Sequence, residues 1–129
     1  MKNKTQLVHE IGEEALRTPD LQEVDWESFA VVIDLADGVY AQSGFLYLED
    51  DIEPFIAESE DPLAMRHLAK ELAETLKNET GQDIVQILVQ IQNEDSKIKI
   101  DFEYEDRNRW SIKPSTMFKM REELRPSFD

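Results

Sequence analysis

A strict two-residue alternation of apolar and polar side chains in the second half of the chain most constrains its fold. Residues 97–106 (KIKIDFEYED) alternate apolar with charged side chains, and residues 84–92 (IVQILVQIQ) alternate in a similar way. Because successive side chains of a β-strand point to opposite faces, each segment is predicted to be a strand with one buried face. Residues 93–96 (NEDS) predict a turn between them, so the two strands form a hairpin. The apolar side chains expected to share the buried face are Val85, Ile87, Val89, Ile91, Ile98, Ile100, Phe102 and Tyr104.

A second pair of strands is predicted earlier in the chain. Residues 26–36 (WESFAVVIDLA) and residues 39–48 (VYAQSGFLYL) are rich in β-branched and aromatic side chains. Asp37-Gly38 between them is a strong signal for a two-residue hairpin turn, because glycine tolerates a positive φ. The apolar positions of the second segment change parity halfway along it, which predicts a β-bulge at Ser43-Gly44. The side chains expected to share the buried face of the first segment are Phe29, Val31, Ile33 and Leu35.

Three helices are predicted around these strands. Residues 4–17 and residues 62–80 carry apolar side chains at helical spacing. Asp61 is expected to cap the second of these helices, and Gly81 is expected to end it. A shorter helix is expected at residues 115–124, where three apolar side chains also recur at helical spacing.

The predicted order of elements is α-β-β-α-β-β-α, in a single domain that spans residues 1–129. Two hairpins imply an α+β fold with a mainly antiparallel sheet of four strands, or five, and helices packed on one face. The other face is then free to meet solvent or a partner. Its amides, carboxylates and tyrosines fit a binding surface, although an ordinary solvated sheet face is the simpler interpretation. The side chains expected on this open face are Val32, Asp34, Tyr40, Gln42, Tyr47, Gln86, Gln90, Gln92, Asp101 and Glu103.

The chain is strongly acidic, and its charge is unevenly distributed. It contains 29 acidic and 14 basic residues, for a net charge of −15. Residues 1–65 carry a net charge of −13, whereas residues 66–129 carry −2. Nucleic-acid phosphates and anionic membranes need a positive surface, so the composition argues against binding to either and favours a basic partner.

The densest acidic segment is residues 49–61 (EDDIEPFIAESED), which holds seven carboxylates and no basic residue. It is expected to be a loop. Ile52, Phe55 and Ile56 lie among the acids and either pin the loop to the core or, if Phe55 is exposed, anchor an interface rimmed by charge. Repulsion between the carboxylates costs stability, which binding to basic residues would justify. Solubility alone is a common alternative reason for an acidic loop.

No motif for catalysis or metal binding is evident. His9 and His67 each lie on a predicted helix without HExxH spacing, and a partly exposed helix position explains both. A carboxylate pair of the glycosidase type or a calcium site is conceivable. The acids at residues 50–53, however, do not match the EF-hand pattern, and a solvated loop explains them better. The sequence therefore predicts a protein that is not an enzyme and has no cofactor or metal.

The first residues, MKNKTQLVHEIGEEA, lack the long apolar run of a signal peptide, and no segment approaches the length of a membrane-spanning helix. The chain also contains no cysteine, which removes any disulfide framework or thiolate site and fits a reducing compartment. A cytoplasmic location is expected.

A first helix, a hairpin that ends in GFLYLEDD, a central helix and a late strand KIKIDFEYED followed by Trp110 together form a familiar layout. This layout resembles the YezG-like immunity proteins, which are antitoxins of bacterial polymorphic toxin systems. The resemblance covers residues 5–112. The C-terminal segment KPSTMFKMREELRPSFD, with its predicted helix, departs from it.

The resemblance implies an immunity-protein domain that inhibits a cognate toxin, for example in contact-dependent growth inhibition, without chemistry of its own. Such toxins are frequently nucleases, and an acidic protein can occupy the positive groove that a nuclease needs for phosphates. The alternatives are an acidic adaptor or chaperone for a basic secreted protein, and a small hydrolase or metal-dependent enzyme. The oligomeric state is left open, with a monomer favoured.

Two sets of residues are the candidate toxin contacts. Carboxylates would pair with lysines and arginines of the toxin, and aromatic side chains would fill the desolvated centre of the interface. The first-choice contacts are Tyr47, Asp50, Asp51, Glu53, Phe55, Glu58, Glu60 and Asp61. The second-choice contacts, on the predicted open face, are Asp34, Tyr40, Asp101 and Glu103.

Overall fold

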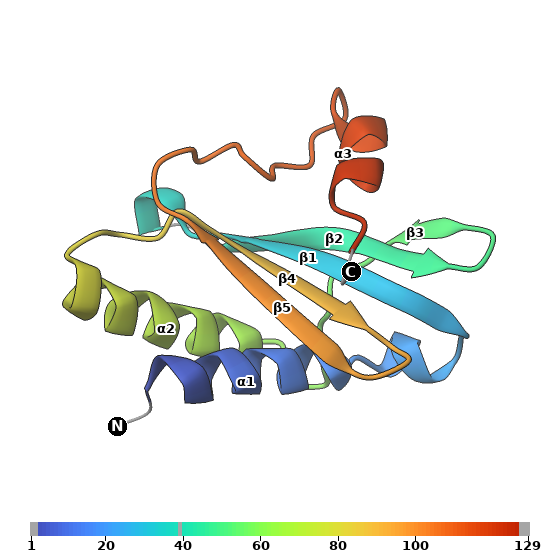
Figure 1. The fold of residues 1–129 in the computed structure, drawn as a ribbon, viewed down its shortest axis with the longest axis horizontal. Helices are drawn as coiled ribbons and strands as arrows, with labels where there is room; N and C mark the ends of the chain where they lie inside the picture. Colours follow the sequence, from blue (N-terminus) through green and yellow to red (C-terminus); the bar gives the residue numbers. More distant parts are fainter. Residues whose placement is uncertain (1–2, 39, 127–129) are drawn as a thin grey trace.

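The structure is a computed structural model that describes residues 3–38 and 40–126 of the 129-residue chain (Figure 1). Two 3₁₀ turns, Pro19–Gln22 and Ala36–Gly38, supplement the helices and strands. The helices and strands, in chain order, are α1 (Lys4–Leu16), β1 (Trp26–Asp34), β2 (Ala41–Leu48), β3 (Ile52–Pro54), α2 (Ala64–Thr80), β4 (Gln86–Gln92), β5 (Lys97–Glu103) and α3 (Met117–Glu123).

The five strands form one antiparallel sheet in the order β3-β2-β1-β4-β5. The predicted α+β class and the order of the elements are confirmed in this coarse form. The fifth strand, β3, is three residues long and lies inside the acidic segment, which was expected to be a loop. β1 and β4 pair in the middle of the sheet, so the two hairpins share one continuous sheet.

Helices α1 and α2 lie side by side on one face of the sheet (Figure 1). The apolar rows expected from the alternation point to these helices, because Val31, Ile33, Ile87, Val89 and Ile91 are all buried in the core beneath them. The half-buried apolar side chains of β5 pack against the same core. Burial of these rows removes apolar area from water, which is the main favourable contribution to folding.

The ends of α1 and α2 follow local sequence signals. Asn3 and Gln6 form a reciprocal capping box at the start of α1. Gly81 ends α2 in the left-handed conformation, with φ of 78°, as expected. Asp61 is not the N-cap of α2, which falls at Leu63. The carboxylate of Asp61 instead accepts a hydrogen bond of 3.1 Å from the backbone N–H of Leu63, in the turn that precedes the helix.

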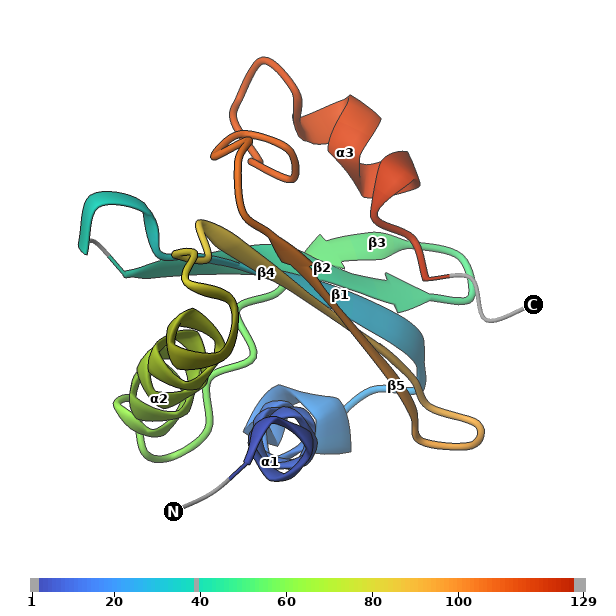
Figure 2. The ribbon, with the colours of Figure 1, turned by 60° about the vertical axis from the view of Figure 1, so that its left-hand side comes forward.

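The second face of the sheet is not open. The C-terminal segment crosses it and ends in α3, on the side opposite α1 and α2 (Figure 2). The expectation that all helices pack on one face is therefore wrong. The central strands carry apolar side chains on both faces, which is typical of strands buried on both sides. The second core beneath α3 consists of Ala30, Val32, Phe45, Tyr47, Leu88, Trp110, Met120 and Leu124.

The first hairpin also differs from its predicted form. Its connection spans residues 35–40, because Asp34 pairs with Ala41. Val39 lies outside the described residues. The register of β1 against β2 runs regularly through Ser43-Gly44. The irregularity lies instead between Trp26 and Ser28, at the start of β1. The bulge was wrongly expected because Ala41, at the start of β2, was assigned to the same core face as Leu46 and Leu48. Ala41 is exposed, whereas Leu46 and Leu48 pack in the core beneath α1 and α2, so no change of parity is needed.

Candidate functional site

The first half of the acidic segment forms a tight edge hairpin. β2 ends at Leu48, whose backbone N–H donates a hydrogen bond of 2.8 Å to the backbone carbonyl of Asp51. The Asp51 carboxylate accepts a further hydrogen bond of 2.8 Å from the backbone N–H of Ile52. β3 then pairs with β2, so that Glu53 lies opposite Leu46 at the edge of the sheet. These contacts hold the four acids of residues 49–53 on ordered backbone.

Two buried residues pin the middle of the segment. Phe55 is 5% exposed, and its ring centre lies 4.9 Å from that of Phe29 in the core. Its backbone N–H donates a hydrogen bond of 2.9 Å to the carbonyl of Gly44. Ala57 is also buried, in a left-handed conformation with φ of 62°. Ile56 between them is 54% exposed.

Two of the first-choice contacts are therefore not surface residues. Phe55 is buried in the core against Phe29. Tyr47 is fully buried under α3, where its hydroxyl bonds to the backbone carbonyl of Arg121. Burial raises the pKa of the Tyr47 hydroxyl well above its ordinary value, so this group stays a neutral hydrogen-bond donor. The other first-choice residues are all exposed: Asp50, Asp51, Glu53, Glu58, Glu60 and Asp61.

The second half of the acidic segment is fastened to the C-terminal end of α1. Ser59 donates a hydrogen bond from its hydroxyl to the carboxylate of Glu14. Glu14 is a buried acid, and the guanidinium of Arg17 lies 3.2 Å from its other oxygen. The acids of residues 58–61 thus lie beside the helical layer, whereas those of residues 49–53 lie on the sheet edge (Figure 1).

The acids of residues 49–61 form the densest group of carboxylates in the chain, and they have no local counter-ion among the described residues. None of these seven carboxylates forms an ion pair with a lysine or arginine within residues 3–38 and 40–126. Outside the segment, ion pairs within 4.0 Å are frequent, as in Lys77–Asp83 at 3.0 Å and Arg109–Glu103 at 2.8 Å. Seven of the unpaired acids in the described part of the chain therefore lie within these 13 residues, although unpaired acids such as Glu27 and Glu74 also occur outside the segment.

The second-choice contacts do not share one open face. Asp34 lies under the C-terminal segment, where it accepts a hydrogen bond of 2.6 Å from the side-chain amide of Gln86. Tyr40 lies on the face of α1 and α2, with the guanidinium of Arg66 5.9 Å from its ring centre. Burial raises the pKa of the Tyr40 hydroxyl above its ordinary value.

Asp101 and Glu103 remain neighbours on β5, as predicted. Lys99 lies 4.0 Å from the carboxylate of Asp101. Glu103 accepts hydrogen bonds from the backbone N–H groups of Glu105 and Asp106 and from the side chain of Arg109. These donors, with the N–H of Glu105 the strongest, lower the pKa of Glu103 to about 2. Glu103 therefore organises the bend that follows β5.

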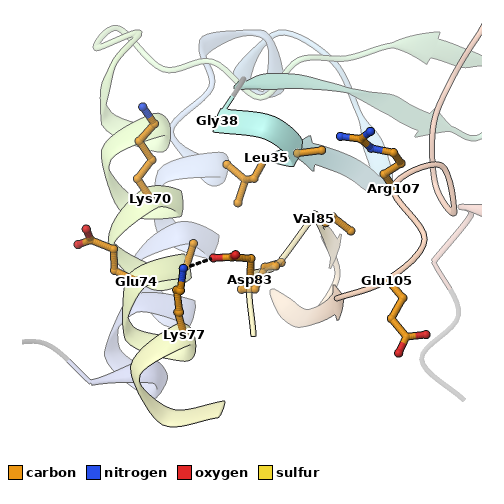
Figure 3. A pocket seen from close by; sticks show the side chains of 12 residues that line it. Leu35, Gly38, Lys70, Glu74, Lys77, Asp83, Val85, Glu105 and Arg107 are labelled. Atoms are coloured by element: carbon orange, nitrogen blue, oxygen red, sulfur yellow. Dashed lines mark ion pairs between the residues drawn. The ribbon is translucent and has the colours of Figure 1, made fainter. Parts of the chain in front are cut away.

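One groove was not anticipated from the sequence (Figure 3). It has a volume of about 780 Å³ and lies between the C-terminal half of α2 and the ends of β1 and β5. Its rim carries three basic and three acidic side chains, and Lys77 and Asp83 pair across part of it. Because segments far apart in sequence line it, no local pattern signals it. The charged rim residues are Lys70, Glu74, Lys77, Asp83, Glu105 and Arg107.

The two histidines lie on different helices, α1 and α2. The imidazole of His9 lies 2.7 Å from the carboxylate of Glu13 on α1, and His67 is exposed on α2. Within the described part of the chain, no group of three or more histidine, aspartate and glutamate side chains is placed to hold a metal ion. None of the described helices is both long and apolar enough to cross a membrane.

The fold and this surface define an α+β protein with a five-stranded antiparallel sheet and an ordered acidic segment. A scan against protein-family models gives no match to the chain, and a search of curated proteins gives none either.

Proposed function

We propose that the protein is an immunity protein that binds a basic toxin in the cytoplasm and blocks its activity, like the YezG-like proteins that it resembles. The observation that carries the proposal is the set of exposed carboxylates in residues 49–61 that have no basic counter-ion within the described chain. A partner that supplies lysines and arginines relieves the repulsion within this set. Such complementarity also accelerates association, which matters when the toxin can kill the cell that makes it.

The order of the acidic segment supports a binding role over a purely solvating one. Pairing of β3 with β2 and burial of Phe55 and Ala57 hold the carboxylates in fixed positions. A preorganised surface loses less conformational entropy on binding than a mobile loop does. Exposed Ile56 takes the place of Phe55 as the apolar contact among the acids. The revised contact set is Asp50, Asp51, Glu53, Ile56, Glu58, Glu60 and Asp61.

A nuclease is the class of toxin that this surface fits best. A nuclease needs a positive groove to bind phosphates. Carboxylates spaced along residues 49–53 offer a row of negative charge to the same groove, so the immunity protein competes with the nucleic acid without cleaving or binding it. The protein itself acts only through complementary contact.

The test is a pull-down of the purified protein against the product of the gene immediately upstream, followed by an assay of nuclease activity in the complex. We expect a complex that forms at low salt, weakens as salt rises, and is inactive as a nuclease. A stable complex whose partner stays fully active would instead support the adaptor or chaperone function. Failure to form a complex with a basic partner would contradict both functions.

A further inference from the structure

The outer edge of β5 (Lys97–Glu103) is an open edge of the sheet. β5 is the last strand in the order β3-β2-β1-β4-β5, and no described strand pairs with its outer side. In an antiparallel ladder, alternate residues direct their backbone N–H and C=O groups away from the neighbouring strand. β5 is seven residues long, whereas β3 at the opposite edge has three. Such an edge is a template for a further strand.

The polar face of β5 has a charge order that is complementary to itself. Along the strand it carries two lysines, at residues 97 and 99, and then two acids, at residues 101 and 103. When two copies pair antiparallel about Ile100, Lys97 faces Glu103 of the second copy. Lys99 likewise faces Asp101 of the second copy. Each of these charges therefore faces an opposite charge, and such cross-strand pairs are favourable. The Lys99–Asp101 pairs carry most of this complementarity, because Glu103 is already bound by Arg109 of its own chain.

The backbone and the apolar face fit the same register. In this register each even-numbered residue of β5 faces an even-numbered residue of the second copy, and each odd-numbered residue faces an odd-numbered one. Residues whose backbone N–H and C=O groups point outward from the sheet therefore face one another and can form hydrogen bonds. On the helix side, Ile98 faces Phe102 of the second copy, and Ile100 faces its own counterpart. These three side chains are only half-buried in one copy. Contact with the second copy would cover more of their apolar surface.

We propose that two copies of this chain associate through their β5 edges and so join their sheets into one continuous antiparallel sheet. Charged edge strands often serve to prevent pairing. An edge that only repels would carry one sign of charge, whereas this one carries lysines in one half and acids in the other. Because β3 is at the opposite edge, the dimer leaves residues 49–53 of each copy free at its two ends. The proposal does not depend on the proposed immunity function.

The test is sedimentation of the full chain at concentrations from about 1 to about 100 µM in physiological salt, where long-range repulsion between the acidic copies is screened. Two single variants are compared with the native chain, one at Lys99 and one at Asp101. Both side chains are suitable for substitution because they are 52% and 47% exposed and lie outside both cores. Lys99→Asp places two acids opposite each other, and Asp101→Lys places two lysines opposite each other. Each variant alone is expected to dimerise about ten-fold more weakly than the native chain.

Mixing the two variants restores opposite charges in every pair, so a heterodimer is expected at native strength or above. Lys119→Asp makes the same change of charge as Lys99→Asp at an exposed side chain of α3; it is the matched control and should dimerise like the native chain. A native chain that stays monomeric over the whole range would overturn the proposal. So would variants that dimerise like the native chain, or a mixture that does not regain dimerisation.

The register has its own measurement, because the chain contains no cysteine. Ile100→Cys places two thiols directly opposite each other on the two-fold axis, at a separation that a disulfide can span. Mild oxidation should give a covalent dimer in high yield. Lys113→Cys, at an exposed position outside β5, is the control for random collisions. Equal yields from the two variants would contradict the proposed register.

Discussion

The hydroxyl of Tyr47 on β2 donates a hydrogen bond of 2.8 Å to the backbone carbonyl of Arg121 on α3. The guanidinium of Arg125 lies 4.8 Å from the centre of the same ring. A second such contact joins the side-chain amide of Gln90 to the carbonyl of Leu124, at 2.9 Å. The C-terminal segment, which departs from the YezG-like layout, is therefore an integral layer of this fold.

Tyr47→Phe removes the hydroxyl and leaves the ring in place. The carbonyl of Arg121 then loses its donor, and we expect the free energy of unfolding to fall by about 1 kcal/mol. Urea denaturation measures this change. Tyr104→Phe is the matched control, because the Tyr104 hydroxyl bonds to no residue in the described part of the chain. A loss no larger than that of the control would mean that the contact with Arg121 adds nothing to stability.

Removal of the chain from residue 113 onward exposes the second core. Val32, Phe45 and Tyr47 lose the cover of Met120 and Leu124. Loss of this burial predicts a much lower midpoint of thermal unfolding and strong binding of a dye that detects exposed apolar surface. Calorimetry and dye fluorescence on the truncated chain measure both. A truncated chain with the native midpoint and no dye binding would show that α3 does not contribute to the core.

Gly44→Ala introduces a β-carbon on β2 directly against the backbone of β1. That carbon would lie 2.0 Å from the backbone carbonyl oxygen of Ala30, and neither backbone can give way without breaking the pairing. We expect a loss of about 2 kcal/mol or more, or failure to fold. Ser43→Ala on the same strand is the control and should change stability by less than about 1 kcal/mol. Chemical denaturation of both variants measures the difference, and equal stabilities would contradict the close approach.

Glu103 gives stability a specific dependence on pH. Its pKa is about 2 in the folded chain, below its unfolded value, because the N–H of Glu105, then Arg109, then the N–H of Asp106 stabilise the carboxylate. Its contribution is therefore complete above the unfolded pKa and is lost as the pH falls toward 2. Glu103→Gln should destabilise the protein near neutral pH and progressively less below about pH 4.5. Unfolding measured at several pH values checks this. A stability gap between variant and native chain that stays constant with pH would contradict it.

The sequence predicts those parts of the fold in which a single pattern decides the structure. The strict alternation in β5 predicts a strand with one apolar face. The helical spacing in α2 ends at Gly81, which takes the left-handed conformation. In β1, by contrast, residues 29–33 are apolar on both faces. That run is the signal of a second core, and it was interpreted as a strand with only one buried face.

The candidate site shows the same limit. Composition alone identifies the acidic segment, because residues 49–61 contain seven carboxylates and no basic residue. Which neighbouring apolar side chain is buried depends on the register of β3 against β2, and that register turns Phe55 inward and leaves Ile56 outside. The burial of Tyr47 depends on α3, which follows it by a long stretch of chain. Contacts of this range leave no local trace in the sequence.

The most direct test of the proposed immunity function is a binding titration of the upstream gene product with a triple charge reversal, Asp50→Lys, Asp51→Lys and Glu53→Lys, at low and high salt. The matched control reverses three exposed acids outside the segment: Glu74→Lys, Glu79→Lys and Glu105→Lys. We predict that the first variant loses most of its affinity and of the salt dependence of binding, and no longer inhibits the toxin. The control should keep both to within a few-fold. Equal affinity and inhibition in the two variants would contradict a toxin-binding role for residues 49–53.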